Sequence, residues 1–219
     1  MPKSQPRQAQ SQATLLLVLT TGIWGFTFVT NQSLLRTISA IDIMTWRFGI
    51  ASVLLIAFNP SALKQLTRRT ATQGLVLGSL LSLGYITQLV GLKTTTATAS
   101  GFITGLFVIF TPIISSTLFR NRISKLAWFA VALTTVGLGL LALKGWSIET
   151  GDLLTLVCAF VFACHIVGLG QWSRAHIAYA LTTLQISVVF ILSLIVSVTQ
   201  GGPTHNYTAA NWRDLIFLA

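Results

Sequence analysis

One charged residue stands inside an apolar segment, and it is the strongest sign of chemistry in the sequence. Arg47 lies about seven residues into segment 40–58, hence about 10 Å from its end in a helix that rises about 1.5 Å per residue. A charge at that depth in lipid is costly unless it pairs, faces water or extends to the boundary. The guanidinium is therefore a candidate anchor for a carboxylate or another anion. The alternative is an arginine that reaches outward or holds helix ends together.

Polar and aromatic side chains on other apolar segments are further candidates for a binding site. Polar groups inside lipid must face the protein, because lipid offers no hydrogen-bond partner. This applies to Asn31, Gln32, Tyr85, Gln88 and Gln185. We expect Tyr85, Gln88 and Gln185 to line a cavity together with Arg47. Trp24, Trp46 and Phe107 could supply its apolar walls, although each aromatic residue also suits plain packing or an interfacial belt.

Segment 97–119 combines closely spaced glycines with a proline. Gly101 and Gly105 are four residues apart, a spacing that lets helices approach closely. Pro112 follows Thr111 and removes the helical donor of the Val108 carbonyl, which commonly kinks a helix. Thr111 and Pro112 are therefore a candidate hinge, and a packing kink without substrate contact is the alternative.

The remaining titratable residues give little support to catalysis. His165 is alone near the middle of segment 153–169, where it could carry protons or simply form an interior hydrogen bond. Cys158 and Cys164 are expected to be apolar packing residues. The sequence contains no metal-ligand cluster, no phosphate-binding loop in a strand–turn–helix context and no carboxylate pair within an apolar segment. We therefore expect no enzyme activity, no metal and no cofactor.

The composition indicates which surroundings position these residues. Apolar residues make up 53% of the 219 residues, and charged residues only 8%, with 14 basic and 4 acidic side chains. So few charges could not cover the surface of a soluble protein, in which roughly a quarter of the residues are charged. The basic residues fall between apolar segments and form no dense patch with aromatics, so nucleic acid is not an expected partner. The chain is predicted to be an integral membrane protein.

Apolar segments of membrane-crossing length recur along the chain. About 20 mainly apolar residues cross a bilayer core as a helix. Seven segments meet this requirement and an eighth begins near Trp212: 13–35, 40–58, 71–92, 97–119, 126–143, 153–169 and 177–199. The first is about twice as long as the apolar part of a signal peptide and lacks a cleavage motif. The fold class is therefore predicted to be all-α, a polytopic transmembrane helix bundle.

The charges between the segments predict an orientation. With the N-terminus inside, nine basic residues lie on the inner side and four on the outer side, as the positive-inside rule requires. All four acidic residues then fall at outer ends. We expect a multi-pass protein of the cell (inner) membrane with a cytoplasmic N-terminus.

A shift of 138 residues superimposes the first two segments on the sixth and seventh. Arg36 falls on Arg174 and Ala40 on Ala178, and Gln185 takes the position of Arg47. The copies start five segments apart, so the second would enter the membrane in the opposite sense. Inverted repeats of this kind are typical of secondary transporters, in which two related halves surround a midplane site.

Several short motifs, in order and at fitting distances, resemble the drug/metabolite transporter superfamily, EamA type. They are Ile23-Trp24-Gly25-Phe26-Thr27-Phe28, Trp46-Arg47-Phe48, Ala97-Thr98-Ala99-Ser100-Gly101-Phe102, Phe110-Thr111-Pro112 and Gly151-Asp152-Leu153-Leu154. The turn after the fourth segment departs from the family, since it reads Phe119-Arg120-Asn121-Arg122 where the family usually carries a Gly-Glu pair. The resemblance implies ten helices in two inverted five-helix repeats. Residues 1–12 would be a cytoplasmic tail, 13–144 the first repeat and 150–219 an incomplete second repeat, with two further spans expected beyond Ala219.

The resemblance also implies a function. It predicts a secondary transporter that exports a small metabolite, amino acid-like compound or drug by alternating access, with a small-molecule substrate and the lipid bilayer as partners and homodimer formation left open. Arg47 in polar surroundings would suit a zwitterion or an anion. The alternative is a structural or regulatory membrane protein, or an inactive truncated relative. A midplane cavity lined by Arg47, Gln88 and Gln185 would favour transport, and a filled core would argue against it.

Overall fold

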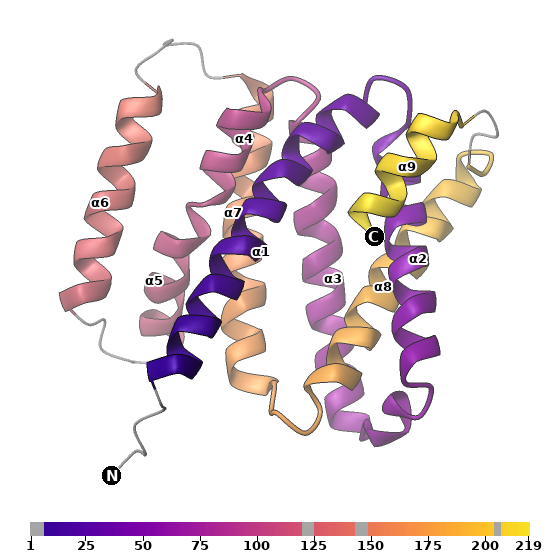
Figure 1. Ribbon diagram of the computed structural model, residues 1–219, viewed down its shortest axis with the longest axis horizontal. Helices are drawn as coiled ribbons and strands as arrows, with labels where there is room; N and C mark the ends of the chain where they lie inside the picture. Colours follow the sequence, from indigo (N-terminus) through magenta and orange to yellow (C-terminus); the bar gives the residue numbers. More distant parts are fainter. Residues whose placement is uncertain (1–6, 120–124, 143–148, 204–206) are drawn as a thin grey trace.

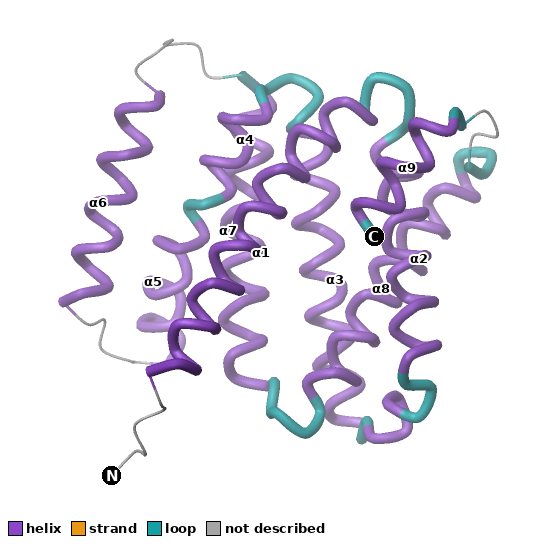
Figure 2. Tube along the Cα trace, in the orientation of Figure 1, coloured by secondary structure: helices purple, strands orange, loops and turns teal. Residues whose placement is uncertain are grey.

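The computed structural model describes residues 7–119, 125–142, 149–203 and 207–219, and this part of the chain is helical without a strand (Figure 2). Residues 120–122, in the turn that departs from the family's Gly-Glu pattern, lie outside the described residues. The elements, in chain order, are α1 (Arg7–Leu34), α2 (Ala40–Phe58), the 3₁₀ turn η1 (Ala62–Gln65), α3 (Arg68–Gly91), α4 (Ala97–Thr104), α5 (Phe107–Phe119), α6 (Lys125–Ala142), α7 (Thr150–Trp172), α8 (Ala178–Thr199) and α9 (Ala209–Leu218).

The chain is a multi-pass membrane protein by the length and composition of its helices. Six helical segments in the described residues are long and apolar enough to cross a bilayer: Thr14–Leu34, Ala40–Phe58, Arg68–Gly91, Ala97–Leu118, Thr150–Trp172 and Ala178–Thr199. They confirm six of the predicted segments within a few residues at each end. The fifth predicted segment coincides with α6, which is not among the six, and α9 begins three residues before Trp212.

Short polar side chains start the helices. Ser39 Oγ accepts the backbone N–H of Asp42 at the start of α2. Thr67 and Thr70 form a reciprocal capping box at the start of α3, and Thr208 and Asn211 form another before α9. Each cap satisfies backbone donors that have no partner in the first helical turn. These boundaries therefore follow from local sequence.

The helices α2, α3, α7 and α8 form the centre of the bundle, while α1 crosses in front and α6 packs at one side (Figure 1). Glycines on α3 permit the close approach. A Cβ on Gly78 would lie 2.6 Å from Cβ of Val188 on α8, and one on Gly91 would lie 2.7 Å from the Gly151 carbonyl at the start of α7. In lipid there is no hydrophobic driving force between helices, and small residues at helix contacts allow the close van der Waals packing that holds the helices together instead.

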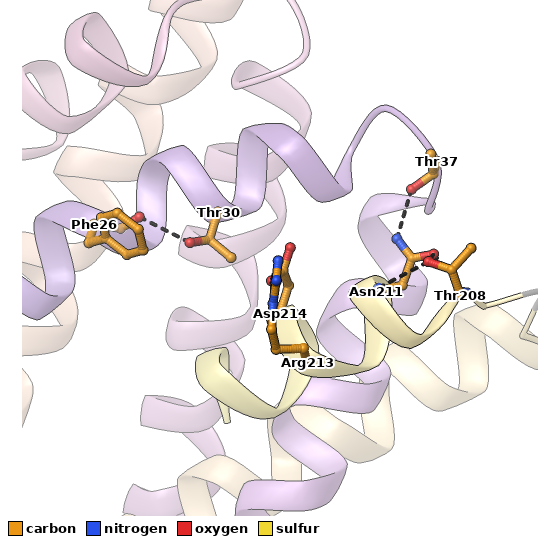
Figure 3. A network of polar contacts seen from close by, with 7 residues as sticks. All are labelled: Phe26, Thr30, Thr37, Thr208, Asn211, Arg213 and Asp214. Atoms are coloured by element: carbon orange, nitrogen blue, oxygen red, sulfur yellow. Dashed lines mark hydrogen bonds and ion pairs between the residues drawn. The ribbon is translucent and has the colours of Figure 1, made fainter.

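The C-terminal helix α9 docks against the ends of α1 and α2 (Figure 3). Leu215 and Leu218 are buried in the main apolar cluster, together with Met44 and Leu89. Asn211 Nδ2 donates to Thr37 Oγ1 at 3.1 Å and so joins α9 to the turn between α1 and α2. The fold therefore packs this short helix through both apolar and polar contacts.

The fourth predicted segment is interrupted at Gly105 and Leu106, not at Pro112. Leu106 and Val108 donate to carbonyls three residues back, at 3.0 and 3.1 Å, which is a local tightening of the helix. Pro112 lies inside α5, in its second turn, where the missing donor removes a single helical bond. The hinge role of Thr111 and Pro112 stays a prediction.

Candidate functional site

Arg47 lies over aromatic rings in the centre of the bundle. It is half-buried, and its Cζ is 4.9 Å from the ring centroid of Tyr85 on α3 and 5.1 Å from that of Phe48. Tyr85 also contacts Phe162 on α7, with ring centroids 5.3 Å apart. The negative ring faces attract the guanidinium. Within the described residues no carboxylate pairs with Arg47, so its charge is available to an anion.

Gln88 lies one helical turn after Tyr85 and is buried. Its Nε2 donates to Thr104 Oγ1 of α4 at 3.2 Å and approaches Cys158 Sγ of α7 at 3.8 Å. The amide therefore links three helices. Gln88 and Tyr85 are three residues apart, and this spacing puts both side chains on one face of α3.

Gln185 and His165 form a buried pair between α8 and α7. His165 Nε2 and Gln185 Oε1 are 2.7 Å apart, and Gln185 Nε2 donates to the Leu181 carbonyl at 3.1 Å. The histidine thus forms an interior hydrogen bond, which is one of the two roles that the sequence suggested for it. Its role in proton coupling stays a prediction.

Trp24 and Phe107 contact each other, with ring centroids 5.7 Å apart, and Phe28 adds a further ring 6.0 Å from Trp24. This aromatic pair joins α1 to α5. The structure thus brings the predicted residues together in separate sets: Arg47 with Tyr85, Trp24 with Phe107, and Gln88 and Gln185 each with a partner of their own.

The expected inward orientation of the polar residues is confirmed for three of them. Asn31, Gln88 and Gln185 are buried, whereas Gln32 and Tyr85 are half-buried. Gln32 Nε2 donates to the Thr95 carbonyl at 2.9 Å. The Asn31 side-chain oxygen is buried, and no group in the described part of the chain donates a hydrogen bond to it, which is costly in an apolar interior.

Sequence reasoning missed four aromatic or polar members of these sets, namely Phe28, Phe48, Phe162 and Thr104. Phe28 and Phe48 were visible only as the last residues of two family motifs. Phe162 falls on Trp24 under the 138-residue shift, which was a usable signal. Nothing in the sequence indicated Thr104, because its contact with Gln88 depends on how α4 packs against α3.

A pocket lies away from the Arg47 set. It has a volume of about 650 Å³ and opens at the start of α3, beside the turn between α7 and α8. Its lining includes Arg69, Thr70, Trp172, Arg174 and His176, and we call it the end pocket. Arg47, Gln88 and Gln185 do not line it, so the end pocket is not the predicted midplane cavity.

Apolar helices of membrane-crossing length with polar side chains buried between them define a multi-pass membrane protein. Residues 12–143 match the EamA-like transporter family, and the chain belongs to that family. A protein of Archaeoglobus fulgidus named as an uncharacterized transporter is 35% identical over 182 residues. That alignment covers 83% of this chain and 56% of the relative, so the chain spans little more than half the relative's length. The resemblance seen in the sequence motifs is confirmed.

Proposed function

We propose that the protein is a secondary transporter that exports a small metabolite, amino acid-like compound or drug by alternating access. Membership of a transporter family supports transport. The proposed location is the cell membrane, with the N-terminus in the cytoplasm and nine basic residues on the inner side.

The equal spacing of helix boundaries is the observation that carries alternating access, and the antiparallel contact between α2 and α8 is compatible with it. A Cβ on Gly49 would lie 2.9 Å from the ring of Phe190, and the hydroxyls of Ser52 and Ser187 are 2.7 Å apart. A shift of 138 residues turns position 49 into 187 and position 52 into 190. The two contacts are therefore counterparts of each other. Any two antiparallel helices give such pairs, and the shift of 138 residues would put a local two-fold axis close to these two contacts.

Helix boundaries support the same repeat. α1 ends at Leu34 and α7 at Trp172, while α2 begins at Ala40 and α8 at Ala178, and each pair is 138 residues apart. In Figure 1, α1 and α7 run in opposite directions. We accordingly propose residues 13–144 as the first repeat, preceded by the tail 1–12, and 150–219 as part of an inverted second repeat.

Arg47 is the proposed binding group for the substrate. Its charge without a carboxylate partner in the described residues favours a carboxylate or another anionic group. Tyr85 and Gln88 lie on the facing helix α3, and Trp24, Phe107 and Gln185 would contribute when the site opens. Proton coupling through His165 and bending at Thr111 and Pro112 belong to the same proposal.

The alternative is a membrane protein that does not transport. One observation favours it: Gln88 and Gln185 are satisfied by Thr104 and His165. In this case the polar groups would specify helix packing, not bind a substrate.

Transport by the 219-residue chain in liposomes separates the two. A panel of labelled amino acids and small carboxylates would be offered to the wild-type chain, Arg47→Ala, Arg47→Lys and Arg36→Ala. The last variant changes an exposed arginine in the turn between α1 and α2. We expect Arg47→Ala to lower uptake by at least about tenfold, from the loss of a charged hydrogen bond. Arg47→Lys should retain part of the activity and Arg36→Ala all of it. Full activity of Arg47→Ala would exclude the site, and no uptake by wild-type protein would favour the alternative.

A further inference from the structure

The end pocket is lined by positive and neutral polar groups from three elements. Arg69, Thr70 and Gln73 come from the first two turns of α3, while Trp172 ends α7 and Arg174 and His176 lie in the turn to α8. These elements meet at the end of the bundle where α1 begins (Figure 1). Its volume of about 650 Å³ is within the usual range of small-molecule sites, about 300–1,000 Å³.

The charges around the end pocket are uncompensated. Within the described residues neither Arg69 nor Arg174 forms an ion pair, and no acidic side chain lines the pocket. Asp42 and Asp152 lie near the starts of α2 and α7, at the opposite end of the bundle. Two arginines on separate elements therefore present their donors to one opening.

The start of α3 adds to this positive potential. Its first turn carries Arg68 and Arg69 and no acidic residue. A helix N-terminus carries partial positive charge, so arginines there are unfavourable unless an anion lies nearby. The capping box already holds the backbone donors of Thr67 and Thr70, so the attraction for an anion here comes from the arginines and from the partial charge of the helix end.

We propose that the end pocket binds a phosphate group. Guanidinium groups recognise phosphate oxygens in bidentate fashion, and Arg69 and Arg174 can engage one phosphate from two sides. Trp172 suits the boundary between lipid and water, where tryptophan is enriched. The phosphate can belong to the headgroup of an anionic phospholipid or to a free anion. The site is separate from Arg47 and independent of transport.

Binding measured on the purified 219-residue chain tests the proposal. Phosphatidylglycerol, phosphatidylcholine and inorganic phosphate would be titrated separately, with lipid retention read by native mass spectrometry and affinity by thermal shift. The variant Arg69→Gln/Arg174→Gln removes both guanidiniums. The matched control Arg36→Gln/Lys93→Gln removes two exposed basic residues at the other end of the bundle. All four residues are exposed, so we expect both variants to fold.

We expect phosphatidylglycerol to bind more tightly than phosphatidylcholine, with the affinity weakened at least about tenfold in Arg69→Gln/Arg174→Gln and unchanged in the control. Binding of inorganic phosphate with the same loss would identify a free anion as the source, and binding of the lipid alone would identify the headgroup. Equal weakening in both variants would reduce the effect to general charge and overturn the proposal. The proposal would also be overturned if neither phosphatidylglycerol nor inorganic phosphate bound the wild-type chain more tightly than phosphatidylcholine. The readout is binding, so failure of the transport assay leaves this result unaffected.

Discussion

At the scale of single residues, Arg47 is held by rings and not by a carboxylate. Its Cζ lies within 5.1 Å of the centroids of Phe48 and Tyr85. An ion pair would neutralise the guanidinium, whereas a ring face attracts it and leaves the net charge in place. This arrangement keeps a positive charge inside the bundle at moderate cost, which is what a site for an anionic substrate requires.

The ring of Tyr85 should therefore stabilise Arg47. Replacing Tyr85 by Leu is expected to cost about 1 kcal/mol through loss of the cation–π contact, while Tyr85→Phe keeps the ring and most of that energy. Unfolding in mixed micelles would measure both variants. A double-mutant cycle of Tyr85→Leu with Arg47→Met should give a coupling of about 0.5–1 kcal/mol. Strict additivity would show that the ring does not hold the arginine.

The pair of Gln185 and His165 makes a second residue-scale prediction. Gln185→Leu leaves a buried imidazole nitrogen without its partner at 2.7 Å. We expect the free energy of unfolding to fall by about 1–3 kcal/mol. The double variant Gln185→Leu/His165→Leu should recover part of this loss, because both polar groups are then removed. Gln171→Leu, at an exposed position on α7, serves as the control and should change stability by less than about 0.5 kcal/mol.

Residue types predicted which polar side chains of the candidate site are buried, but not which residues they contact. The burial of Asn31, Gln88 and Gln185 followed from chemistry alone, because polar groups in lipid must turn inward. Their partners did not, because Thr104 and His165 come from helices whose packing no local pattern reveals. The matching positions of Arg47 and Gln185 suggested one shared cavity, yet their interactions are with different neighbours.

At the scale of elements, glycine sets how closely α3 can approach α8. A Cβ on Gly78 would lie 2.6 Å from Cβ of Val188 and 3.1 Å from the Gln185 carbonyl, and neither atom is the end of a flexible side chain. Gly78→Ala is therefore expected to destabilise the protein by about 1–3 kcal/mol. Gly170 on α7 has no atom within 4 Å of an added Cβ. Gly170→Ala should instead be neutral or stabilising by up to about 1 kcal/mol. Equal effects of the two variants in thermal unfolding would contradict the packing.

Element boundaries were largely predictable, and one interruption was not. Segment 40–58 coincides with α2 because the capping residue Ser39 and the polar Asn59 enclose a mainly apolar run. The break at Gly105 and Leu106 escaped prediction because a proline is a stronger local signal than a glycine. Gly105 allows the tightened backbone at this break, since a Cβ there would lie only 3.1 Å from the Phe102 carbonyl.

At the scale of the whole molecule, basic side chains lie at both ends of the bundle, whereas Asp42 and Asp152 lie at the same end. Lys64, Arg69 and Arg174 lie at the end where α3 begins, and Asp152 lies at the end where α7 begins (Figure 1). The positive-inside rule assigns the first end to the cytoplasm. This orientation is a prediction that chemical labelling of intact cells can check.

Single cysteines at Lys64 and Arg36, in a background with Cys158→Ala and Cys164→Ala, would report the two ends. Both positions are exposed. An impermeant maleimide should label Arg36→Cys in intact cells and label Lys64→Cys only after permeabilisation. The opposite pattern would reverse the proposed topology, and with it the side on which the end pocket opens.

The proposed two-fold relation between α2 and α8 makes a mechanical prediction. When two inverted repeats exchange conformations, contacts far from their two-fold axis open and close. A contact on the axis is formed by equivalent residues of the two repeats, so the exchange leaves it unchanged. Ser52 and Ser187, with hydroxyls 2.7 Å apart, are beside Gly49 and Phe190, whose contact is the counterpart of theirs. The proposed axis therefore passes close to this point, and the contact should persist in both states.

A disulfide between Ser52→Cys and Ser187→Cys, in the same cysteine-free background, tests this directly. The short distance between the serine hydroxyls is compatible with disulfide geometry. We expect transport in liposomes to remain within about twofold of the reduced protein, because a pivot tolerates a cross-link that a moving gate does not. The single variants Ser52→Cys and Ser187→Cys control for loss of the hydroxyls. If oxidation abolished transport and a reductant restored it, α2 and α8 would have to separate during the cycle, and the axis between them would be excluded.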